Sequence, residues 1–226
     1  MRVALFGGSF DPPHRGHVAL ARLAIDRFHL DRVVVAPVGS QPFKHDATTG
    51  FEHRMAMLRL AFAGNPRIEI SGMDAAHADG RPNYTLETIL HLKHSLDPND
   101  ELFCLLGADS WLTIGKWYRA TELLMACDFI VGARPGFDLA QAVAPLPKGI
   151  FATKVPSDLV GCFLFSLSNG AGHRCRLYLL PDLAEDVSAS EVRAALSQGS
   201  AVDQEAVLDP EVAKYIRARK LYGVEM

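Results

Sequence analysis

The chain has 226 residues and a formal net charge of −3, and 49% of its residues are hydrophobic against 22% charged. This is the composition of an ordinary globular protein, long enough to bury a sizeable core. The near-neutral charge balance argues against a protein held on nucleic acid by a basic surface, although it leaves room for a local anion site. At about 150 residues per domain, the length fits one domain or one domain with an appendage.

Neither a targeting segment nor a membrane anchor is expected. The apolar run at the N-terminus is short and ends at two glycines, unlike a signal peptide. No stretch approaches the roughly 18 apolar residues that a transmembrane helix needs. The four cysteines, at positions 104, 127, 162 and 175, form no C-x-x-C pair, which predicts buried reduced thiols rather than disulfides or a zinc site. We therefore expect a cytoplasmic protein that contacts no membrane.

Short apolar runs alternate with helical patterns along the first 133 residues. In chain order the sequence predicts a strand at 3–6, a helix at 16–28, a strand at 31–39, a polar loop at 40–50, a helix at 51–64, a strand at 67–71, a helix at 83–96, a strand at 101–106, a helix at 120–127 and a strand at 128–133. Asn83 followed by Glu87 begins the third helix like a capped one. The alternation indicates an α/β fold with a doubly wound, mainly parallel sheet covered on both faces.

The second part of the chain has a weaker pattern. Residues 138–175 show no clean period and are expected to form loops and short elements. A strand is predicted at 177–181 and helices at 188–199 and 210–223, the last with Pro210 in its first turn and Gly223 past its end. The expected organisation is a single domain, 1–226, with a helical C-terminal subregion at about 186–226.

The chain after the first strand reads G-G-S-F-D-P-P-H-R-G-H, from Gly7 to His17. Gly7 and Gly8 let the backbone turn sharply and let a ligand approach it, so the N–H groups of Ser9 and Phe10 can point at that ligand. The helix start that follows adds unpaired N–H groups and a partial positive charge. Ligands of such sheets bind beyond the carboxyl ends of the strands, and a phosphate is the usual occupant of such a turn.

His14 and His17 are three residues apart in the first helical turn and therefore share one face. Both imidazoles can donate to phosphate oxygens, and Gly16 leaves a surface without a side chain where a flat ring fits. One alternative is a metal site with Asp11 as third ligand. Another is that the histidines are incidental surface residues, which leaves the glycines and prolines unexplained. Neither G-x-x-x-x-G-K-[ST] nor G-x-G-x-x-G occurs, which disfavours a P-loop enzyme or a dehydrogenase.

H-R-G-H at 14–17 matches the H-x-G-H motif of the nucleotidyltransferase superfamily, and the whole opening stretch resembles that of bacterial nicotinate-nucleotide adenylyltransferases. Six further segments resemble motifs of this family: PVGSQPFK at 37–44, NYTLET at 83–88, GAD at 107–109, WY at 117–118, RPG at 134–136 and SASEVR at 188–193. The resemblance covers most of the chain. Ser190 stands where the family usually has threonine and keeps a hydroxyl, whereas Ala189 replaces a serine and offers none. Asn83 in place of serine is a milder change.

This resemblance implies transfer of AMP from ATP to nicotinate mononucleotide, which forms deamido-NAD and releases pyrophosphate. The nucleophile is a phosphate monoester with a second pKa of about 6, so it is mostly ionised at neutral pH. The leaving group is magnesium pyrophosphate, so neither a general base nor a general acid is needed. What is left to the protein is to position two anions in line and to stabilise charge at the α-phosphorus. Mg²⁺ is expected to arrive with ATP.

The resemblance also implies roles for individual residues. His14, His17, Lys44 and Arg193 are expected to act on the phosphates, with His17 nearest the reacting one. The other residues expected to bind ATP are Gly7, Gly8, Ser9, Phe10, Gly16, Gly107, Asp109, Arg134, Ser188 and Ser190. Asp109 would hydrogen-bond a ribose and is the protein group expected near Mg²⁺; its alternative is a helix cap. The alternative for Lys44 and Arg193 is plain surface charge.

Four residues are expected to bind nicotinate mononucleotide: Tyr84, Thr85, Trp117 and Tyr118. An indole stacks on a pyridine ring. Backbone amides near Thr85 and Tyr118 would bind the nicotinate carboxylate and so select the acid over the amide. The alternative for Trp117 is core packing, although its polar and amphipathic neighbours favour a pocket wall.

The expected protein is a nicotinate-nucleotide adenylyltransferase of NAD biosynthesis with a Rossmann-like fold. Three rival functions remain: the same transfer to nicotinamide mononucleotide, transfer to another phosphorylated acceptor such as pantetheine phosphate, and a nucleotide-binding regulatory module without turnover. A class I aminoacyl-tRNA synthetase fragment would carry H-x-G-H, but no K-M-S-K-S loop occurs. The expected partners are ATP and nicotinate mononucleotide, with no nucleic acid and no membrane; a homodimer is left open.

Overall fold

A computed structural model of the protein describes residues 1–40, 49–133, 137–181, 183, 188–197 and 207–223. The strands are β1 (Arg2–Gly8), β2 (Arg32–Pro37), β3 (Ile68–Ile70), β4 (Glu101–Gly107), β5 (Asp128–Gly132), β6 (Ile150–Val155), β7 (Phe163–Asn169) and β8 (Arg174–Leu180). The α-helices are α1 (Arg15–Phe28), α2 (Phe51–Ala61), α3 (Thr85–His94), α4 (Ala108–Trp111), α5 (Ala120–Leu123), α6 (Leu139–Val143), α7 (Ala189–Ser197) and α9 (Pro210–Arg219). Two 3-10 helices are η1 (Ile114–Lys116) and η2 (Leu221–Gly223).

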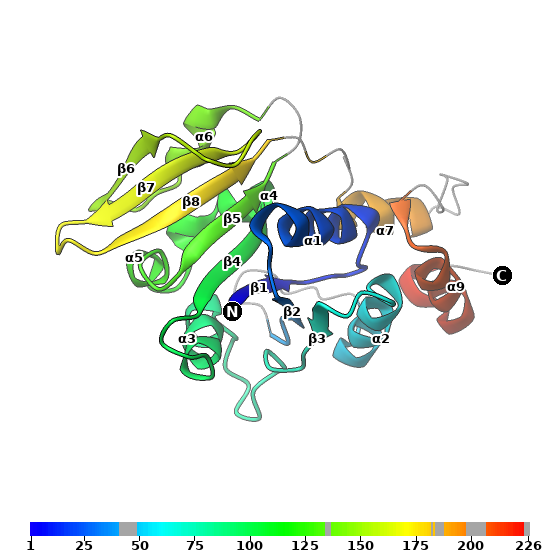
Figure 1. Cartoon of the computed structure of the whole chain (residues 1–226). Coiled ribbons are helices and arrows are strands. Elements are labelled where there is room, and N and C mark those ends of the chain that lie inside the picture. Colours follow the sequence, from blue (N-terminus) through cyan, green and yellow to red (C-terminus); the bar gives the residue numbers. More distant parts are fainter. Residues whose placement is uncertain (41–48, 134–136, 182, 184–187, 198–206, 224–226) are drawn as a thin grey trace.

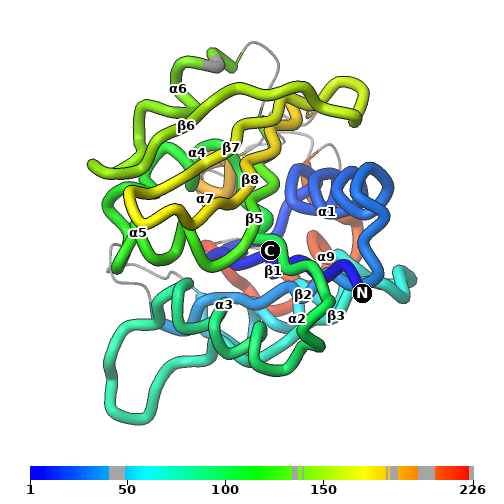
Figure 2. The backbone as a smooth tube through the Cα atoms, turned by 60° about the vertical axis from the view of Figure 1, so that its left-hand side comes forward, coloured from blue at the N-terminus to red at the C-terminus, as the bar shows by residue number. Residues whose placement is uncertain are grey.

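The strands of the described residues form one sheet in the order β3-β2-β1-β4-β5-β8-β7-β6. Neighbours from β3 to β8 are parallel, whereas β7 is antiparallel to both β8 and β6. Figures 1 and 2 show the hairpin of β6 and β7 at the edge of the sheet far from β3. The predicted α/β fold with a mainly parallel sheet is confirmed.

Helices cover both faces of the sheet, and β1 shows why its sequence is continuously apolar. Ala4 and Phe6 of β1 belong to the core that contains α1, α2, α7 and α9, while Val3 and Leu5 belong to the core that contains α3, α4, α5 and α6. None of these four side chains is more than 3% exposed. A strand buried on both faces has no polar side to alternate with the apolar one.

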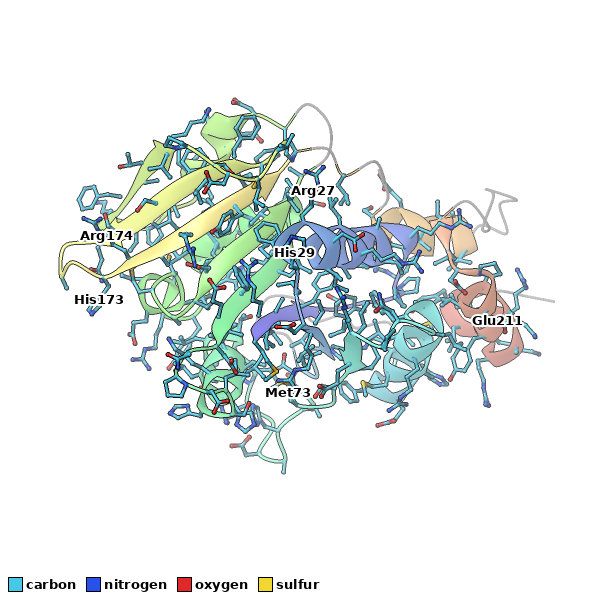
Figure 3. All side chains as sticks on the ribbon, in the orientation of Figure 1. Arg27, His29, Met73, His173, Arg174 and Glu211 are labelled. Carbon is cyan, nitrogen blue, oxygen red and sulfur yellow. The ribbon has the colours of Figure 1, made fainter. Side chains whose placement is uncertain are left out.

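The C-terminal end of α1 is tied to the antiparallel part of the molecule. Figure 3 labels Arg27 and His29 at this end of the helix. Arg27 donates to the backbone oxygen of Val160, which lies in the turn between β6 and β7. His29 ends the helix in a left-handed conformation, with φ of 49°. The hairpin is thereby held to the same layer as α1.

The four cysteines are free and buried, as predicted. Burial raises the pKa of the Cys104 thiol to about 12 and also raises the pKa of Cys175. These thiols are therefore protonated and unreactive at neutral pH. Within the part of the chain that the structure describes, no helix combines the length and the apolarity that crossing a bilayer requires.

The region from 138 to 175 is more regular than the sequence predicts. It contains α6, β6, β7 and the start of β8 rather than loops and short elements. β6 is an edge strand whose side chains are mostly exposed or partly buried, and β7 carries large apolar residues on both faces, Leu164 as well as Phe165. β6 therefore lacks the period of two that marks a half-buried strand, and in β7 Leu164 interrupts that period.

Two predicted helix ends are wrong. The residue before α3 is Tyr84, and no side chain caps this helix. Asn83 instead accepts from the Ser40 backbone N–H at 2.9 Å and donates to the Ala75 oxygen at 2.9 Å, so it joins two loops. The last helix ends at Arg219 rather than running toward Gly223, because Lys220 takes a left-handed φ of 52°. The chain then turns through η2.

Candidate active site

The carboxyl ends of β1 and β4 mark the place where the strand order reverses. From β1 the order runs outward to β2 and β3, and from β4 it runs outward to β5. The elements that follow the two strands lie on opposite faces, since α1 belongs to one core and α4 to the other. A crevice at such a point is the usual ligand site of an open α/β sheet.

Two cavities open there and share part of their walls. One, of about 380 Å³, is lined by His14 and His17, and we call it the histidine cavity. The other, of about 450 Å³, is lined by Tyr84, Trp117 and Tyr118, and we call it the aromatic cavity. The residues common to both are Gly7, Gly8, Ser9, Asp109 and Ser110. Ligands in the two cavities would therefore meet beyond the ends of β1 and β4.

The histidine cavity gathers the residues that the sequence predicts to bind ATP. Its lining includes Gly7, Gly8, Ser9, Phe10, His14, Gly16, His17, Gly107, Asp109, Ser188, Ser190 and Arg193. Lys44 and Arg134 of the same prediction lie outside the described residues. Gly132, at the end of β5, also lines the cavity, and sequence reasoning missed it. A Cβ on Gly132 would stand 2.4 Å from the end of the Leu20 side chain, so a larger residue there would require Leu20 of α1 to move.

The imidazole of His17 is held in one tautomer. The backbone N–H of His14 donates to Nδ1 of His17 at 3.1 Å. A ring nitrogen that accepts carries no proton, so in the neutral ring the proton is on Nε2. Burial, together with the neighbouring His14, holds the pKa of His17 well below its usual 6.5. At pH 7 His17 is therefore a neutral donor at Nε2.

Aromatic packing fixes the turn that precedes the histidines. The Phe10 ring lies edge-on to His17, with centroids 4.9 Å apart, and edge-on to Phe6 at 5.2 Å. The backbone at Phe10 has a φ of 49°, and the side chain is 1% exposed. A bulky residue keeps this left-handed conformation only where its surroundings hold it. The packed ring thereby stabilises the turn in which Ser9 and Phe10 line the cavity.

The glycines of this site differ in what they need. A Cβ on Gly8 would stand 3.2 Å from the Phe10 ring, which is a packing reason for glycine. A Cβ on Gly7 or on Gly107 would meet no protein atom within 4 Å, and both residues line the histidine cavity. The fold therefore tolerates a side chain at these two positions, but that side chain would occupy part of the cavity in which a ligand would lie.

The start of α7 forms the wall of the histidine cavity opposite α1. Ser188 and Glu191 make a capping box: the Ser188 Oγ accepts from the Glu191 N–H at 3.2 Å, and the Glu191 carboxylate accepts from the Ser188 N–H at 3.0 Å. Arg193 donates to the backbone oxygen of Asp11 at 2.7 Å and to the Ser190 Oγ at 3.2 Å. Arg193 is thus held at the cavity wall by two hydrogen bonds, and its role on the phosphates stays a prediction.

Asp11 is buried and turned away from the cavities. Its side chain is 3% exposed, and its Oδ1 accepts from the Tyr222 hydroxyl at 2.6 Å. Among the residues that the structure describes, no three His, Cys, Asp or Glu side chains come together to hold a metal ion. The alternative of a metal site built from Asp11, His14 and His17 is therefore contradicted.

Arg54 of α2 is a buried arginine that sequence reasoning missed. It is 2% exposed and donates to the backbone oxygens of Ser9 at 2.9 Å, Val38 at 2.8 Å and Thr49 at 3.2 Å. Burial lowers the pKa of Arg54, while Asp11 raises it. The three oxygens belong to the turn after β1 and to the chain on either side of residues 41–48. A signal was present, because Arg54 shares its helix face with the buried positions three, four and seven residues on.

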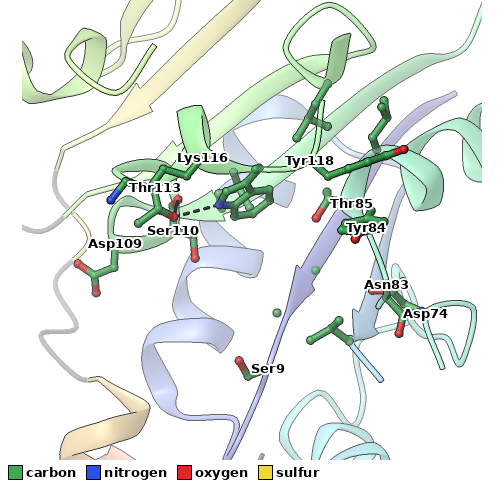
Figure 4. A pocket seen from close by; sticks show the side chains of 17 residues that line it. Ser9, Asp74, Asn83, Tyr84, Thr85, Asp109, Ser110, Thr113, Lys116 and Tyr118 are labelled. Atoms are coloured by element: carbon green, nitrogen blue, oxygen red, sulfur yellow. Dashed lines mark hydrogen bonds between the residues drawn. The ribbon is translucent and has the colours of Figure 1, made fainter. Parts of the chain in front are cut away.

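The aromatic cavity gathers the residues predicted to bind nicotinate mononucleotide (Figure 4). The rings of Tyr84 and Tyr118 stack with centroids 4.1 Å apart and planes 22° apart. Trp117 is partly buried and donates through Nε1 to the Thr113 hydroxyl at 3.0 Å. Core packing is the role of the other tryptophan, Trp111, which is fully buried. Trp117 both lines the cavity and packs against the core beneath it, so each of the two expected positions holds in part.

Asp74 is a second buried residue that sequence reasoning missed. It is 9% exposed, lines the aromatic cavity and accepts from the Thr88 hydroxyl at 2.9 Å. Burial raises its pKa, while the hydrogen bond from Thr88 lowers it. The backbone oxygen of Asp74 accepts from the Gly39 N–H at 2.7 Å, and a Cβ on Gly39 would collide with the backbone of residues 75 and 76. A single aspartate in a polar loop gives no sequence signal.

Asp109 lines both cavities, and Figure 4 labels it at one side of the aromatic cavity. It occupies the second position of α4, and the N-cap of that helix is Gly107. The alternative of a helix cap for Asp109 is therefore wrong. Its neighbour Ser110 lines both cavities as well and was not predicted.

Known proteins resemble this chain along nearly its whole length. The family model described as cytidylyltransferase-like matches residues 5–195. A Geobacter sulfurreducens protein named "Probable nicotinate-nucleotide adenylyltransferase" is 34% identical over 229 residues, which cover 99% of each chain. A Gloeobacter violaceus protein of the same name is 35% identical over 226 residues, which cover 99% of this chain and 97% of that protein.

A solved structure shares the fold. The nicotinic acid mononucleotide adenylyltransferase of Plasmodium falciparum, solved as a complex with NaAD, superposes with a TM-score of 0.71 at 20% identity, covering 99% of this chain and 98% of that one. At this identity the likeness concerns the architecture alone. The sequence relatives and the matched family model go further: this chain belongs to the cytidylyltransferase-like family and, within it, to the nicotinate-nucleotide adenylyltransferases.

Proposed function

We propose that this protein transfers the adenylyl group of ATP to nicotinate mononucleotide, forming deamido-NAD and releasing pyrophosphate in NAD biosynthesis. The observation that carries the proposal is the pair of cavities with a common wall at Gly7, Gly8, Ser9, Asp109 and Ser110. A dinucleotide product requires two adjoining nucleotide sites. Here one site is rich in hydrogen-bond donors for phosphate oxygens, and the other has aromatic walls. Membership of the family supports the same reaction.

The chemistry asks little of acids and bases. The acceptor phosphate has a second pKa of about 6, so its dianion attacks the α-phosphorus of ATP without a base. The bond between the α-phosphorus and the oxygen that bridges it to the β-phosphorus breaks on the opposite side. Pyrophosphate leaves with that oxygen. The protein contributes alignment of the two phosphates and donors for the charge on the transferring group.

The histidine cavity supplies those donors. His17 offers its Nε2 proton to the α-phosphate, where the charge grows in the transition state, and His14 lies beside it. The backbone N–H groups at the start of α7, with Ser188 and Ser190, and the guanidinium of Arg193 hold the β- and γ-phosphates. Lys44 and Arg134 are proposed to join them on the strength of the family motifs.

Mg²⁺ enters this site with ATP. When bound to the phosphates, it neutralises charge on the leaving pyrophosphate. Magnesium in nucleotide sites is commonly held by one or two carboxylates together with substrate phosphates. Asp109 lines both cavities, and we propose that its carboxylate would help to hold an ion carried by ATP.

The aromatic cavity favours the acid form of the acceptor. Its wall contains the first turn of α3, where no side chain caps the backbone N–H groups. A helix N-terminus carries a partial positive charge and binds anions. Lys116 lines the same cavity and adds a full positive charge. We propose that the nicotinate ring lies against Trp117, with its carboxylate on the amides near Thr85 and Tyr118.

Two further expectations accompany the proposal. ATP as substrate and the buried reduced thiols support a cytoplasmic location. A homodimer stays a prediction.

The direct test is to incubate the purified protein with MgATP and nicotinate mononucleotide and to measure both products. Deamido-NAD and pyrophosphate should form in equal amounts. The His17→Ala variant should keep its circular dichroism spectrum and melting temperature within a few degrees and lose about 10²- to 10³-fold in kcat, the usual cost of one transition-state donor. Binding of ATP without either product, for every mononucleotide acceptor offered, would instead support a regulatory nucleotide-binding module.

A further inference from the structure

The C-terminal turn η2 reaches back to the loop that begins the phosphate site. Tyr222 in this turn donates its hydroxyl to Oδ1 of Asp11 at 2.6 Å, although the two residues are 211 positions apart. Asp11 lies between Phe10 and the first turn of α1, so its position affects the whole β1–α1 connection. η2 also contacts α7, which carries Arg193.

Asp11 has a second partner that belongs to the site itself. Its backbone oxygen accepts from Arg193 at 2.7 Å, and Arg193 lines the histidine cavity. One residue thus joins the C-terminal turn, through its carboxylate, to the cationic wall of the cavity, through its carbonyl. Two residues before Asp11, the backbone oxygen of Ser9 accepts a hydrogen bond from the guanidinium of Arg54.

The hydroxyl of Tyr222 also helps to hold a negative charge in place, together with the buried guanidinium of Arg54, on which the Asp11 charge acts. The Asp11 carboxylate is 3% exposed and is held behind the loop, on the side of Tyr222. A carboxylate released from this donor would be attracted to the guanidinium of Arg193, which already bonds to its own backbone. In that position it would compete with the phosphates of ATP for the same cation.

The backbone has a positive φ on both sides of the contact between Tyr222 and Asp11. Tyr222 has a φ of 60° and Phe10 has a φ of 49°, both in the left-handed region that non-glycine residues rarely occupy. Such conformations persist where the surroundings over-determine them, and they gather at functional sites. Burial raises the pKa of Tyr222, and the bond to Asp11 raises it further, so the hydroxyl keeps the proton that it donates.

We infer that Tyr222 is a positioning residue for ATP binding: its hydroxyl holds Asp11 behind the phosphate loop and keeps Arg193 available to the phosphates. The inference rests on the proposed function in taking ATP as the ligand of the histidine cavity. By this inference, the C-terminal turn η2 contributes to a site that is built around the connection between β1 and α1.

A matched pair of variants tests this inference. Tyr222→Phe removes the hydroxyl that bonds to Asp11. Tyr215→Phe removes a hydroxyl from the neighbouring helix α9, where it is 2.9 Å from Nδ1 of His53 and outside both cavities. Both tyrosines are partly buried against the same core, so the chemical change and its cost in packing are alike.

The primary readout is the dissociation constant of MgATP, measured by calorimetry in the absence of acceptor. Tyr222→Phe should weaken ATP binding by about tenfold, the value of one hydrogen bond to a charged group, and Tyr215→Phe should leave it unchanged. The KM for nicotinate mononucleotide should stay the same in both variants, because the aromatic cavity is not touched. Equal ATP affinity of Tyr222→Phe and Tyr215→Phe would overturn the inference.

A double-mutant cycle separates positioning from general loss of stability. Asp11→Ala removes the carboxylate that would compete with ATP and keeps the backbone oxygen that bonds to Arg193, so it should bind ATP nearly as well as the wild type. In the Asp11→Ala background, Tyr222→Phe should therefore cause little further loss of ATP affinity. Fully additive losses would overturn the inference. Because binding is measured without turnover, a wild-type protein that binds ATP but forms no deamido-NAD would contradict the proposed function and leave this test intact.

Discussion

His17 donates to the histidine cavity as a neutral ring because of two local features. The His14 N–H occupies Nδ1, and burial keeps the pKa of His17 well below 6.5. A neutral imidazole costs less to bury than a cation and still presents one proton to a phosphate oxygen. In this chain the second histidine of H-x-G-H accepts a backbone N–H at Nδ1, which leaves its Nε2 proton for the proposed phosphate ligand.

The lowered pKa of His17 predicts a pH dependence of stability. Below pH 6.5 the unfolded chain protonates this histidine while the folded chain does not, so the free energy of unfolding falls as the pH falls through that window, by up to about 1.4 kcal/mol per pH unit. His17→Gln should remove this contribution. Urea unfolding of both proteins between pH 7.5 and about pH 5 measures it, and the exposed His91→Gln provides the control. An unchanged pH slope in His17→Gln would show that His17 titrates normally in the fold.

Gly107 allows a test in which the fold and the ligand site respond differently. Its backbone has an ordinary φ of −78°, and a Cβ there would meet no protein atom within 4 Å. Gly107→Ala should therefore keep the stability of the wild type while its methyl group takes space in the histidine cavity, raising the KM for ATP about tenfold or more. Gly170→Ala, in the turn between β7 and β8 and equally free of contacts, is the control. Unchanged KM values in both variants would remove Gly107 from the ATP site.

The ends of β1 and β2 and the approach to α2 are joined by one side chain. Arg54 donates to backbone oxygens of all three, and the chain between Val38 and Thr49 contains Lys44. In a trans peptide the N–H points opposite to the C=O, so the bond from Arg54 to the Ser9 oxygen turns the Phe10 N–H away from Arg54. Through Arg54, helix α2 thereby sets the direction of the Phe10 N–H in the turn after β1.

Arg54→Lys tests this connection, because a lysine ammonium lacks the planar fork that reaches three separate oxygens. The free energy of unfolding should fall by about 2 kcal/mol, and the KM for ATP should rise about tenfold. Arg59→Lys, an exposed position of the same helix, should change neither quantity. Loss of stability with an unchanged KM would make Arg54 a purely structural residue.

The sheet brings together segments that the sequence keeps far apart. The mainly parallel order and the histidine cavity follow from apolar strands, several of them ending in glycine, whereas the residues of the aromatic cavity were expected only from the resemblance to family motifs. The roles of Asp11, Tyr222 and Asp74 were not predictable, because each depends on a contact across the fold rather than on a local pattern. Tyr222 reads as an ordinary residue of a C-terminal helix until the left-handed Lys220 turns the chain back toward Asp11.

The antiparallel edge escaped prediction for a different reason. β6 is mostly exposed or partly buried and lacks the alternation on which strand prediction relies, and in β7 Leu164 interrupts that alternation. The parallel strands were recognisable because burial on both faces demands a continuous apolar run. That the whole chain is a single domain stays a prediction.

Formation of deamido-NAD depends on two adjoining sites, and we propose that the aromatic cavity selects the acid form of the acceptor. The most direct measurement is a competition in which equal amounts of nicotinate mononucleotide and nicotinamide mononucleotide share limiting MgATP. The ratio of the two dinucleotide products gives the ratio of kcat/KM values. We predict an excess of deamido-NAD over NAD of about a hundredfold, corresponding to about 2.7 kcal/mol from the α3 amides and Lys116. Equal amounts of the two products, or an excess of NAD, would contradict the account.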